Sequence, residues 1–222
     1  MFAAEKGFLD IVRALLERGA NVDAKNSSSK TPLMHACCRG HTDVAEALLT
    51  AGANINVSTN TGETALVFAA AGGHSDTVRL LLMNSADPNK ADKFGDSPLT
   101  HAVVGGHVET ALLLLSEGAL VNHTNAAGYP PLYEACRKNR MDLALVLTEK
   151  GASLECTACS MESMLGQLSR EEDRNLLMRT NRWCRRRGLV LLIEGVIAQN
   201  DRSVSAEVIG NPDLAGQVIA CM

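Results

Sequence analysis

The sequence predicts an all-α protein made of stacked helix-turn-helix repeats followed by a helical tail. The same residue types recur along the chain at a spacing of 33. Each copy holds two short apolar patterns at helical spacing, separated by glycine and polar turns. Helices this short are marginal in water when isolated, so each copy must bury its apolar side on its neighbours. We therefore expect a one-dimensional stack.

The period of 33 is visible as columns of matching residues. Pro32, Pro98 and Pro131 share a register, and a leucine follows each of them. The longest columns are Gly7, Gly40, Gly73 and Gly106; Leu15, Leu48, Leu81, Leu114 and Leu147; and Ala20, Ala53, Ala86, Ala119 and Ala152. Self-similarity at a fixed period of about 20–50 residues is the signature of a repeat array. These columns predict about five units, of which the first is truncated and begins inside its first helix.

Each unit carries the local signals of two helices. In the second copy Thr31 is a suitable N-cap and Pro32 a suitable first helical residue, so a helix is expected to begin there. Gly40 ends this helix, and a second helix is expected from about residue 42 to residue 50. The units are joined by turns such as 92–95, in which glycine permits a positive φ.

Two short motifs recur in the units. Thr31-Pro32-Leu33 and Ser97-Pro98-Leu99 are similar to the T-P-L motif of the ankyrin-repeat family, and Gly40-His41 is similar to its G-H motif. The resemblance covers residues 1–156 and implies an ankyrin-repeat solenoid. The family's histidine after T-P-L is replaced in four copies, by Met34, Val67, Thr100 and Tyr133. Because that histidine ties neighbouring turns together in the family, its loss puts the stability of these turns in question.

Residues 157–222 show no repeat and form a second region, which we expect to be helical. Apolar spacing predicts a helix from residue 171 to about residue 183, and Asn211-Pro212-Asp213 has the pattern of a helix start. Cys156 and Cys159 have the spacing of half a zinc site. A lone C-x-x-C without a second pair is a weak signal, so free thiols are expected here.

The composition restricts the classes of partner and the compartment. Apolar residues make up 46% and charged residues 21% of the chain, which is typical of a globular protein. A net charge of −4 argues against a general nucleic-acid binder. No secretory pattern or membrane-length apolar run is visible, and seven cysteines without framework spacing fit a reducing compartment. We expect a cytoplasmic protein, and Arg185-Arg186-Arg187 leaves a nuclear location open.

The sequence shows no motif for catalysis or cofactor binding. Nucleophile elbows, Walker A loops, dinucleotide fingerprints and H-E-x-x-H patterns are missing from it. His41, His74 and His107 recur in one turn of successive units, so they are expected to be structural. Cys37 and Cys136 occupy alanine positions of the first helices and are expected in the core. We therefore expect no enzyme activity, no cofactor, no metal and no small-molecule substrate.

What remains is the surface, because repeat stacks display their turn tips and first helices along an extended concave face. The tip and first-helix positions predicted to bind a partner are Ser27, Ser28, Lys30, Arg39, Asn60, Thr61, Glu63, Lys93, Phe94, Asp96, Tyr129, Arg137 and Lys138. A further column on the same face comprises His35, Phe68 and His101. Aromatic side chains often anchor interfaces, which favours Phe94 and Tyr129. Packing of Phe94 on an adjacent turn is the open alternative.

These observations favour a protein-protein interaction module that acts as a monomer and binds a protein partner. An adaptor is the alternative function. In that case the tail would recruit other machinery, for example a ubiquitin ligase, to a substrate bound by the repeats.

Overall fold

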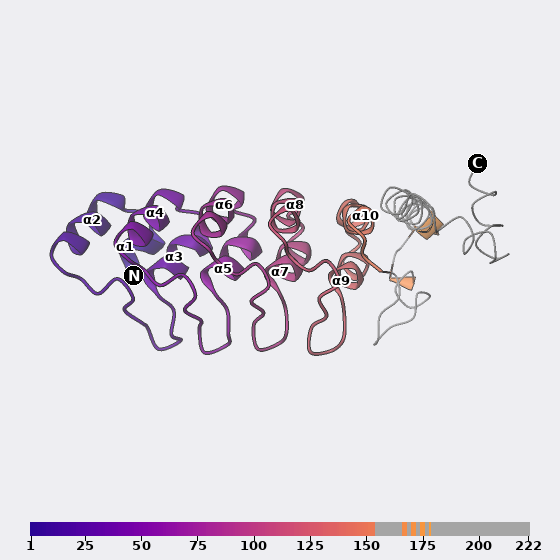
Figure 1. Cartoon of the computed structure of the whole chain (residues 1–222), viewed down its shortest axis with the longest axis horizontal. Coiled ribbons are helices and arrows are strands. Elements are labelled where there is room, and N and C mark those ends of the chain that lie inside the picture. Colours follow the sequence, from indigo (N-terminus) through magenta and orange to yellow (C-terminus); the bar gives the residue numbers. More distant parts are fainter. Residues whose placement is uncertain (154–165, 168–169, 172–173, 176–177, 179–222) are drawn as a thin grey trace, which may run out of the picture.

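A computed structural model of the chain describes residues 1–153, 166–167, 170–171, 174–175 and 178. Within residues 1–153 the chain forms a row of antiparallel helix pairs (Figure 1). The helices are α1 (Phe2–Glu5), α2 (Leu9–Glu17), α3 (Pro32–Arg39), α4 (Thr42–Thr50), α5 (Ala65–Gly72), α6 (Ser75–Met83), α7 (Pro98–Gly105), α8 (Val108–Ser116), α9 (Pro131–Arg137) and α10 (Met141–Glu149). No strand occurs among the described residues, and the predicted all-α repeat stack is confirmed.

The predicted helix starts are confirmed by their capping bonds. The Oγ1 atom of Thr31 accepts a hydrogen bond from the backbone N–H of Met34 at 3.4 Å, and Pro32 is the first residue of α3. Ser97 caps α7 in the same way. These bonds satisfy N–H groups that have no partner inside the helix. Pro130 stands at the N-cap of α9, where no side chain caps the helix.

Glycine is required where α3 turns into α4. Gly40 has a φ of 71°, and a Cβ atom at this position would lie 2.5 Å from Nδ1 of His74 in the next unit. The left-handed backbone and the close approach both exclude a side chain there. Three other left-handed positions in the described part of the chain lack glycine: Ser29 has a φ of 61°, Ser85 a φ of 66° and Asn139 a φ of 54°.

The three G-H histidines link neighbouring units, as predicted. The Nε2 atom of His41 lies 3.0 Å from the carbonyl oxygen of Glu5, one unit earlier. His74 makes the same contact with the carbonyl of Cys38, and His107 with that of Ala71. Each histidine also stands at the N-cap of its outer helix. Their structural role is therefore confirmed.

The core lies between the two helix layers and continues from unit to unit. Leu48, Leu81 and Leu114 of the outer helices are buried, as predicted. The first helices contribute mainly small side chains, which allow the outer helices to pack closely on them. Leu15 has the same register but is 46% exposed, because it belongs to the first unit and no described residue covers its outer side.

The polar residues at the end of the last outer helix differ in exposure. Glu149 and Lys150 are exposed at the end of α10, but Thr148 is buried. Its hydroxyl donates to the carbonyl of Ala144 at 2.7 Å, which satisfies the group inside the helix. The expected tail helix, the 211–213 helix start and Cys156 and Cys159 lie wholly or largely outside the described residues.

Candidate functional site

The turns that join the units project from the same side of the stack and form a row of tips (Figure 1). One side chain organises each tip by accepting two backbone N–H bonds. At the third tip the Oδ1 atom of Asp92 accepts from Phe94 at 2.9 Å and from Asp96 at 3.0 Å. Asn26, Thr59 and Asn125 take this role at the other tips. The tips are therefore fixed locally before any partner binds.

Backbone hydrogen bonds also connect successive tips. The N–H of Asn60 donates to the carbonyl of Ser28 at 3.2 Å, and that of Lys93 donates to Thr61 at 2.9 Å. The N–H of Ala126 donates to the carbonyl of Phe94 at 2.8 Å. Because each tip is bonded to the next, the row behaves as one rigid edge rather than as separate loops.

The first two tips use side chains as well. The amide of Asn60 donates to the carbonyl of Ser27 at 3.1 Å, and the hydroxyl of Ser29 donates to the amide oxygen of Asn60 at 2.7 Å. Within the second tip the carboxylate of Glu63 accepts from the hydroxyl of Thr61 at 2.7 Å. Ser27, Ser28 and Asn60 are exposed, but part of their hydrogen-bonding capacity holds the tips together.

The third tip presents an exposed aromatic side chain. Phe94 is 63% exposed, so the alternative in which it packs on an adjacent turn is wrong. Lys93 beside it is exposed and Asp96 is half-buried, where it accepts from the amide of Asn125 at 3.1 Å. An exposed aromatic ring on a rigid edge loses little conformational entropy on binding, which is typical of an interface anchor.

Tyr129 is placed differently from the exposed position expected for a turn tip. It is half-buried, and its ring stacks on that of Tyr133 with centroids 4.1 Å apart and planes 10° apart. Burial of the phenol, and its proximity to Tyr129, raise the pKa of Tyr133. Tyr133 was not predicted as a site residue. Its position four residues after Tyr129, across the start of α9, was the available signal.

Arg137 and Lys138 stand at the end of α9, and both are exposed. The guanidinium of Arg137 donates from Nε to the carboxylate of Glu134 at 2.9 Å. Glu134 is 7% exposed, and this ion pair compensates its burial. Arg137 therefore presents a partly neutralised guanidinium beside the tyrosine pair.

On the concave column, two residues from neighbouring units meet. The Nζ atom of Lys30 lies 4.3 Å from the ring centroid of Phe68, which is within the range of a cation–π contact. His35 and Arg39 meet at Glu5, whose carboxylate lies 3.1 Å from Nη2 of Arg39 and 3.8 Å from Nδ1 of His35.

The pKa shifts of Glu5 and His35 follow from their surroundings. The hydrogen bond from Arg39 lowers the pKa of Glu5, and burial lowers the pKa of His35. Glu5 was not predicted as a site residue. It could have been found from its charge, which is opposite to that of Arg39 in the adjacent column one unit later.

His101, the third member of the column, pairs with Asp92 at 2.9 Å. Ligand atoms of Asp92, Asp96 and His101 lie within 4.8 Å of one another, a spacing that could hold a cation. However, both carboxylates have partners: Asp92 organises the tip and contacts His101, while Asp96 accepts from Asn125. We therefore assign these three residues to the stability of the third tip.

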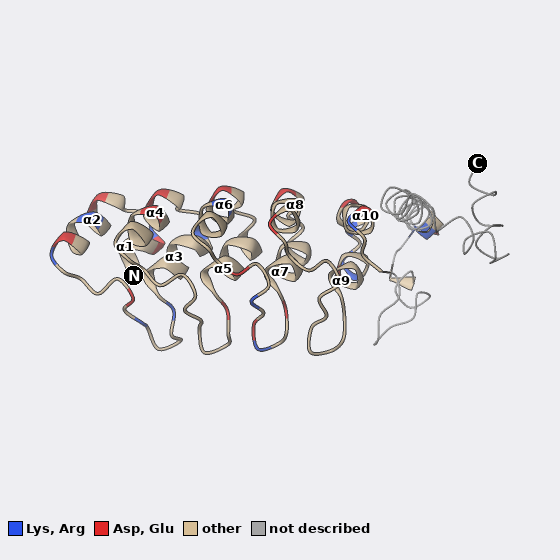
Figure 2. Cartoon of the chain, viewed as in Figure 1, with Lys and Arg blue, Asp and Glu red and all other residues tan. Residues whose placement is uncertain are grey.

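The charged residues of the outer helices are arranged differently from those of the tips. Acidic residues lie in the first turn of each outer helix, whereas the tips carry charges of both signs (Figure 2).

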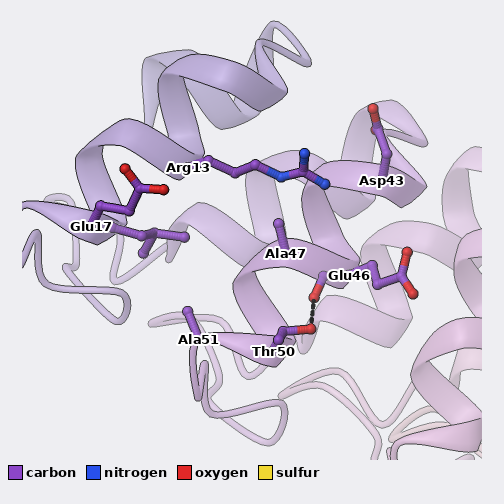
Figure 3. A pocket seen from close by; sticks show the side chains of 8 residues that line it. Arg13, Glu17, Asp43, Glu46, Ala47, Thr50 and Ala51 are labelled. Carbon is purple, nitrogen blue, oxygen red and sulfur yellow. Dashed lines mark hydrogen bonds between the residues drawn. The ribbon is translucent and has the colours of Figure 1, made fainter.

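Between α2 and α4 lies an open pocket of about 450 Å³, into which Arg13 extends beside Asp43 and Glu46 (Figure 3). None of the residues predicted to bind a partner lines this pocket. Among the described residues, no helix has the length and apolarity needed to cross a membrane.

Comparisons with known proteins agree with this architecture. The family model for ankyrin repeats, which comprises three copies, matches residues 1–92 and 82–158. A stretch of 36 residues is 61% identical to a probable E3 ubiquitin-protein ligase, XBOS33, of Oryza sativa subsp. japonica. That match covers 16% of this chain and 7% of the rice protein, so it extends over little more than one repeat. With the family model spanning the whole helix stack, the chain belongs to the ankyrin-repeat family.

Proposed function

We propose that this chain is a protein-interaction module that binds its partner along the turn tips and the adjacent concave column. The observation that supports this most directly is the exposed ring of Phe94 on an edge whose tips are bonded to one another. Preorganisation of this kind reduces the entropy lost on binding and therefore favours recognition by a fixed surface.

The composition of the edge supports discrimination between partners. From the first tip to the fourth, the exposed positions change from serines to Asn60 and Thr61, then to Lys93 and Phe94, and then to alanines beside Tyr129. Because the core columns are nearly uniform, these differences carry most of the information available to a partner. The mixed charge of the tips and the absence of a basic stripe along them favour a protein over a nucleic acid.

The test is a pair of substitutions at the aromatic positions. Affinity purification with crosslinking would first identify a partner of the full-length chain. We expect Phe94→Ala and Tyr129→Ala each to weaken its binding by at least about 1 kcal/mol, or roughly fivefold, as truncation of an interface anchor does.

Met83→Ala is the matched control, since Met83 is 76% exposed and lies at the end of an outer helix. It should leave binding unchanged, and thermal melts should show that all three variants remain folded. Normal binding by Phe94→Ala would move the proposed site to the column of His35, Phe68 and His101.

An adaptor function is the second candidate, favoured by the short match to a probable ubiquitin ligase. In this proposal the repeats select the substrate and the region from residue 157 onward recruits the ligation machinery, in the cytoplasm or nucleus. Comparing the full-length chain with one ending at residue 156 separates the two functions. An adaptor should lose its ligase partner on truncation and keep its substrate, whereas a simple binding module should keep every partner.

A further inference from the structure

The tips and first helices differ in charge from the outer helices. Within the units after the first, the tips and first helices span residues 25–39, 58–72, 91–105 and 124–138, and they hold six lysines and arginines against four acidic residues. The outer helices and the loops that follow them, up to residue 153, hold four against eight. Figure 2 shows the acidic starts of the outer helices in red. The side proposed to bind the partner is therefore the more basic of the two.

The four acidic residues on this side all make contacts within the chain. The carboxylate of Glu63 accepts from two threonine hydroxyls of its own tip, at 3.0 and 2.7 Å. Asp92 accepts from two backbone N–H groups, and Asp96 accepts from a side-chain amide at 3.1 Å. Glu134 is 7% exposed and is paired with Arg137. These carboxylates therefore repel an incoming anion less than four solvated carboxylates would.

The basic residues on this side face the solvent. They are Lys25, Lys30, Arg39, Lys93, Arg137 and Lys138. All are exposed except Lys30, which is half-buried, and the side chain of Arg39 stays 59% exposed although it pairs with Glu5. A surface on which cations are accessible and carboxylates are already bonded attracts anionic side chains.

An aromatic ring accompanies a cation at three places along the stack. The three couples are Lys30 with Phe68, Lys93 with Phe94, and Arg137 with Tyr133. In the first couple the ammonium lies 4.3 Å from the ring centroid. Each couple offers a cation for a carboxylate and a ring for an apolar side chain. A complementary partner therefore combines acidic and apolar side chains.

The first helices between these couples carry only small side chains on their exposed side. Ala71 on α5 and Val104 on α7 are exposed, and a glycine follows each of them. A Cβ atom at Gly72 or Gly105 would lie 2.5 Å from the ring of the histidine two residues later, so both positions are restricted to glycine. A partner backbone can therefore approach these helices closely.

The length of this surface follows from helix packing. Helix α3 contacts α5, α5 contacts α7, and α7 contacts α9. Packed helices have axes about 8–10 Å apart, so the path from α3 to α9 is about 24–30 Å long. An extended chain covers about 3.3 Å per residue, so about seven to nine residues span this path.

From these observations we infer that the partner presents an extended acidic segment of about seven to nine residues, which also contains apolar side chains and lies across the first helices from α3 to α9. The inference rests on the proposed function and names the chemistry of the partner. The acidic outer helices disfavour a nucleic acid, because its phosphates release counterions only to a continuous basic surface.

Selection of random peptides tests the chemistry of the segment. Peptides of about ten residues, long enough to span the path, are displayed on phage and selected on the immobilised full-length chain. We expect the bound peptides to be enriched in Asp and Glu together with aliphatic or aromatic residues, relative to the unselected library.

Fluorescence anisotropy then measures the Kd of the tightest selected peptide. Lys30→Gln, Lys93→Gln and Lys138→Gln combined should raise this Kd at least about tenfold, because three cations that face the segment are lost. Lys93→Gln with Lys138→Gln leaves the Lys30–Phe68 contact in place and should raise the Kd at least about threefold. Thermal melts check that both variants remain folded.

The matched control removes three cations from the ends and faces of outer helices. Arg18→Gln, Arg79→Gln and Lys150→Gln change the net charge by the same amount, and all three residues are exposed. This variant should raise the Kd by less than about twofold, because the charges it removes lie away from the segment.

The outcomes separate this inference from the proposed function. Neutral or basic peptides that lose binding in Phe94→Ala would overturn the inference and leave the proposed function standing. Acidic peptides weakened equally by both triple variants would report net charge alone and would overturn the inference, as would a selection that yields no peptide. Peptides that bind Phe94→Ala and both triple variants as tightly as the wild-type chain would contradict the proposed function as well.

Discussion

Replacing Leu81 with alanine removes three carbon atoms from the centre of the outer-helix layer. Leu81 is 0% exposed and lies in α6, which packs against α4 and α8. At about 0.8 kcal/mol for each buried carbon, loss of burial alone costs about 2.4 kcal/mol. The neighbouring leucines are held by their own helices, so the site cannot close fully and a cavity term is added. We expect a total loss of about 3–4 kcal/mol in the free energy of unfolding.

Leu15→Ala is the matched control for this substitution. Both leucines occupy the same position of an outer helix in the 33-residue period, but Leu15 is 46% exposed. Its truncation should cost about 1 kcal/mol or less, because part of the removed surface is already in water. Urea unfolding followed by far-UV circular dichroism measures both variants. Equal losses for the two variants, or a loss below about 1 kcal/mol for Leu81→Ala, would refute the assignment of this column to the core.

Two further predictions concern local features of the stack. Ser85→Gly should stabilise the chain by about 0.5–1 kcal/mol, because Ser85 holds a left-handed φ of 66° that glycine adopts without strain. Gly118 has a φ of 88° and open space around it, so Gly118→Ser should destabilise the chain through backbone strain alone. The same urea assay measures both variants. A loss of stability for Ser85→Gly would show that its hydroxyl matters more than its backbone. Burial raises the pKa of the Cys136 thiol to about 12 and also raises the pKa of the Cys37 thiol. Iodoacetamide at about pH 8 should therefore alkylate the exposed Cys38 in the native chain and leave both buried thiols intact. Peptide mass spectrometry reads the three sites, with urea-unfolded chain as the positive control, and equal native labelling would contradict the burial.

The helices could be predicted from the sequence because their signals are local. The outer helix expected from about residue 42 to residue 50 is observed from Thr42 to Thr50. Its start and end are set by residues within one turn of the helix, and the 33-residue period repeats these signals in each unit. The histidines of the G-H turn were assigned correctly for the same reason, since a residue that recurs in one column has the same neighbours in every unit.

The contacts between side chains of different units were not predictable in this way. The Lys30–Phe68 contact and the Glu5–Arg39 ion pair each join positions about one period apart, and they depend on how far a long side chain reaches across the gap between units. The exposure of Leu15 was also missed, because a column predicts burial only where another unit covers it. The register of a residue therefore predicts its burial inside the described stack, but not on α2, which has a neighbouring unit on one side only.

The tips illustrate how one row of residues divides its work between folding and recognition. Carbonyls and amides of Ser27, Ser28, Asn60 and Thr61 join neighbouring tips, so substitutions there act first on the rigidity of the edge. Phe94 differs, because its backbone holds the next tip while its ring makes none of these contacts and remains 63% exposed. Removing the ring should therefore change binding with little effect on the fold, whereas changes at the polar tips should alter both together. A preorganised binding edge needs hydrogen-bonded polar residues that fix its backbone and exposed side chains that contact the partner. The third tip supplies both, because Asp92 holds its backbone while the ring of Phe94 is exposed.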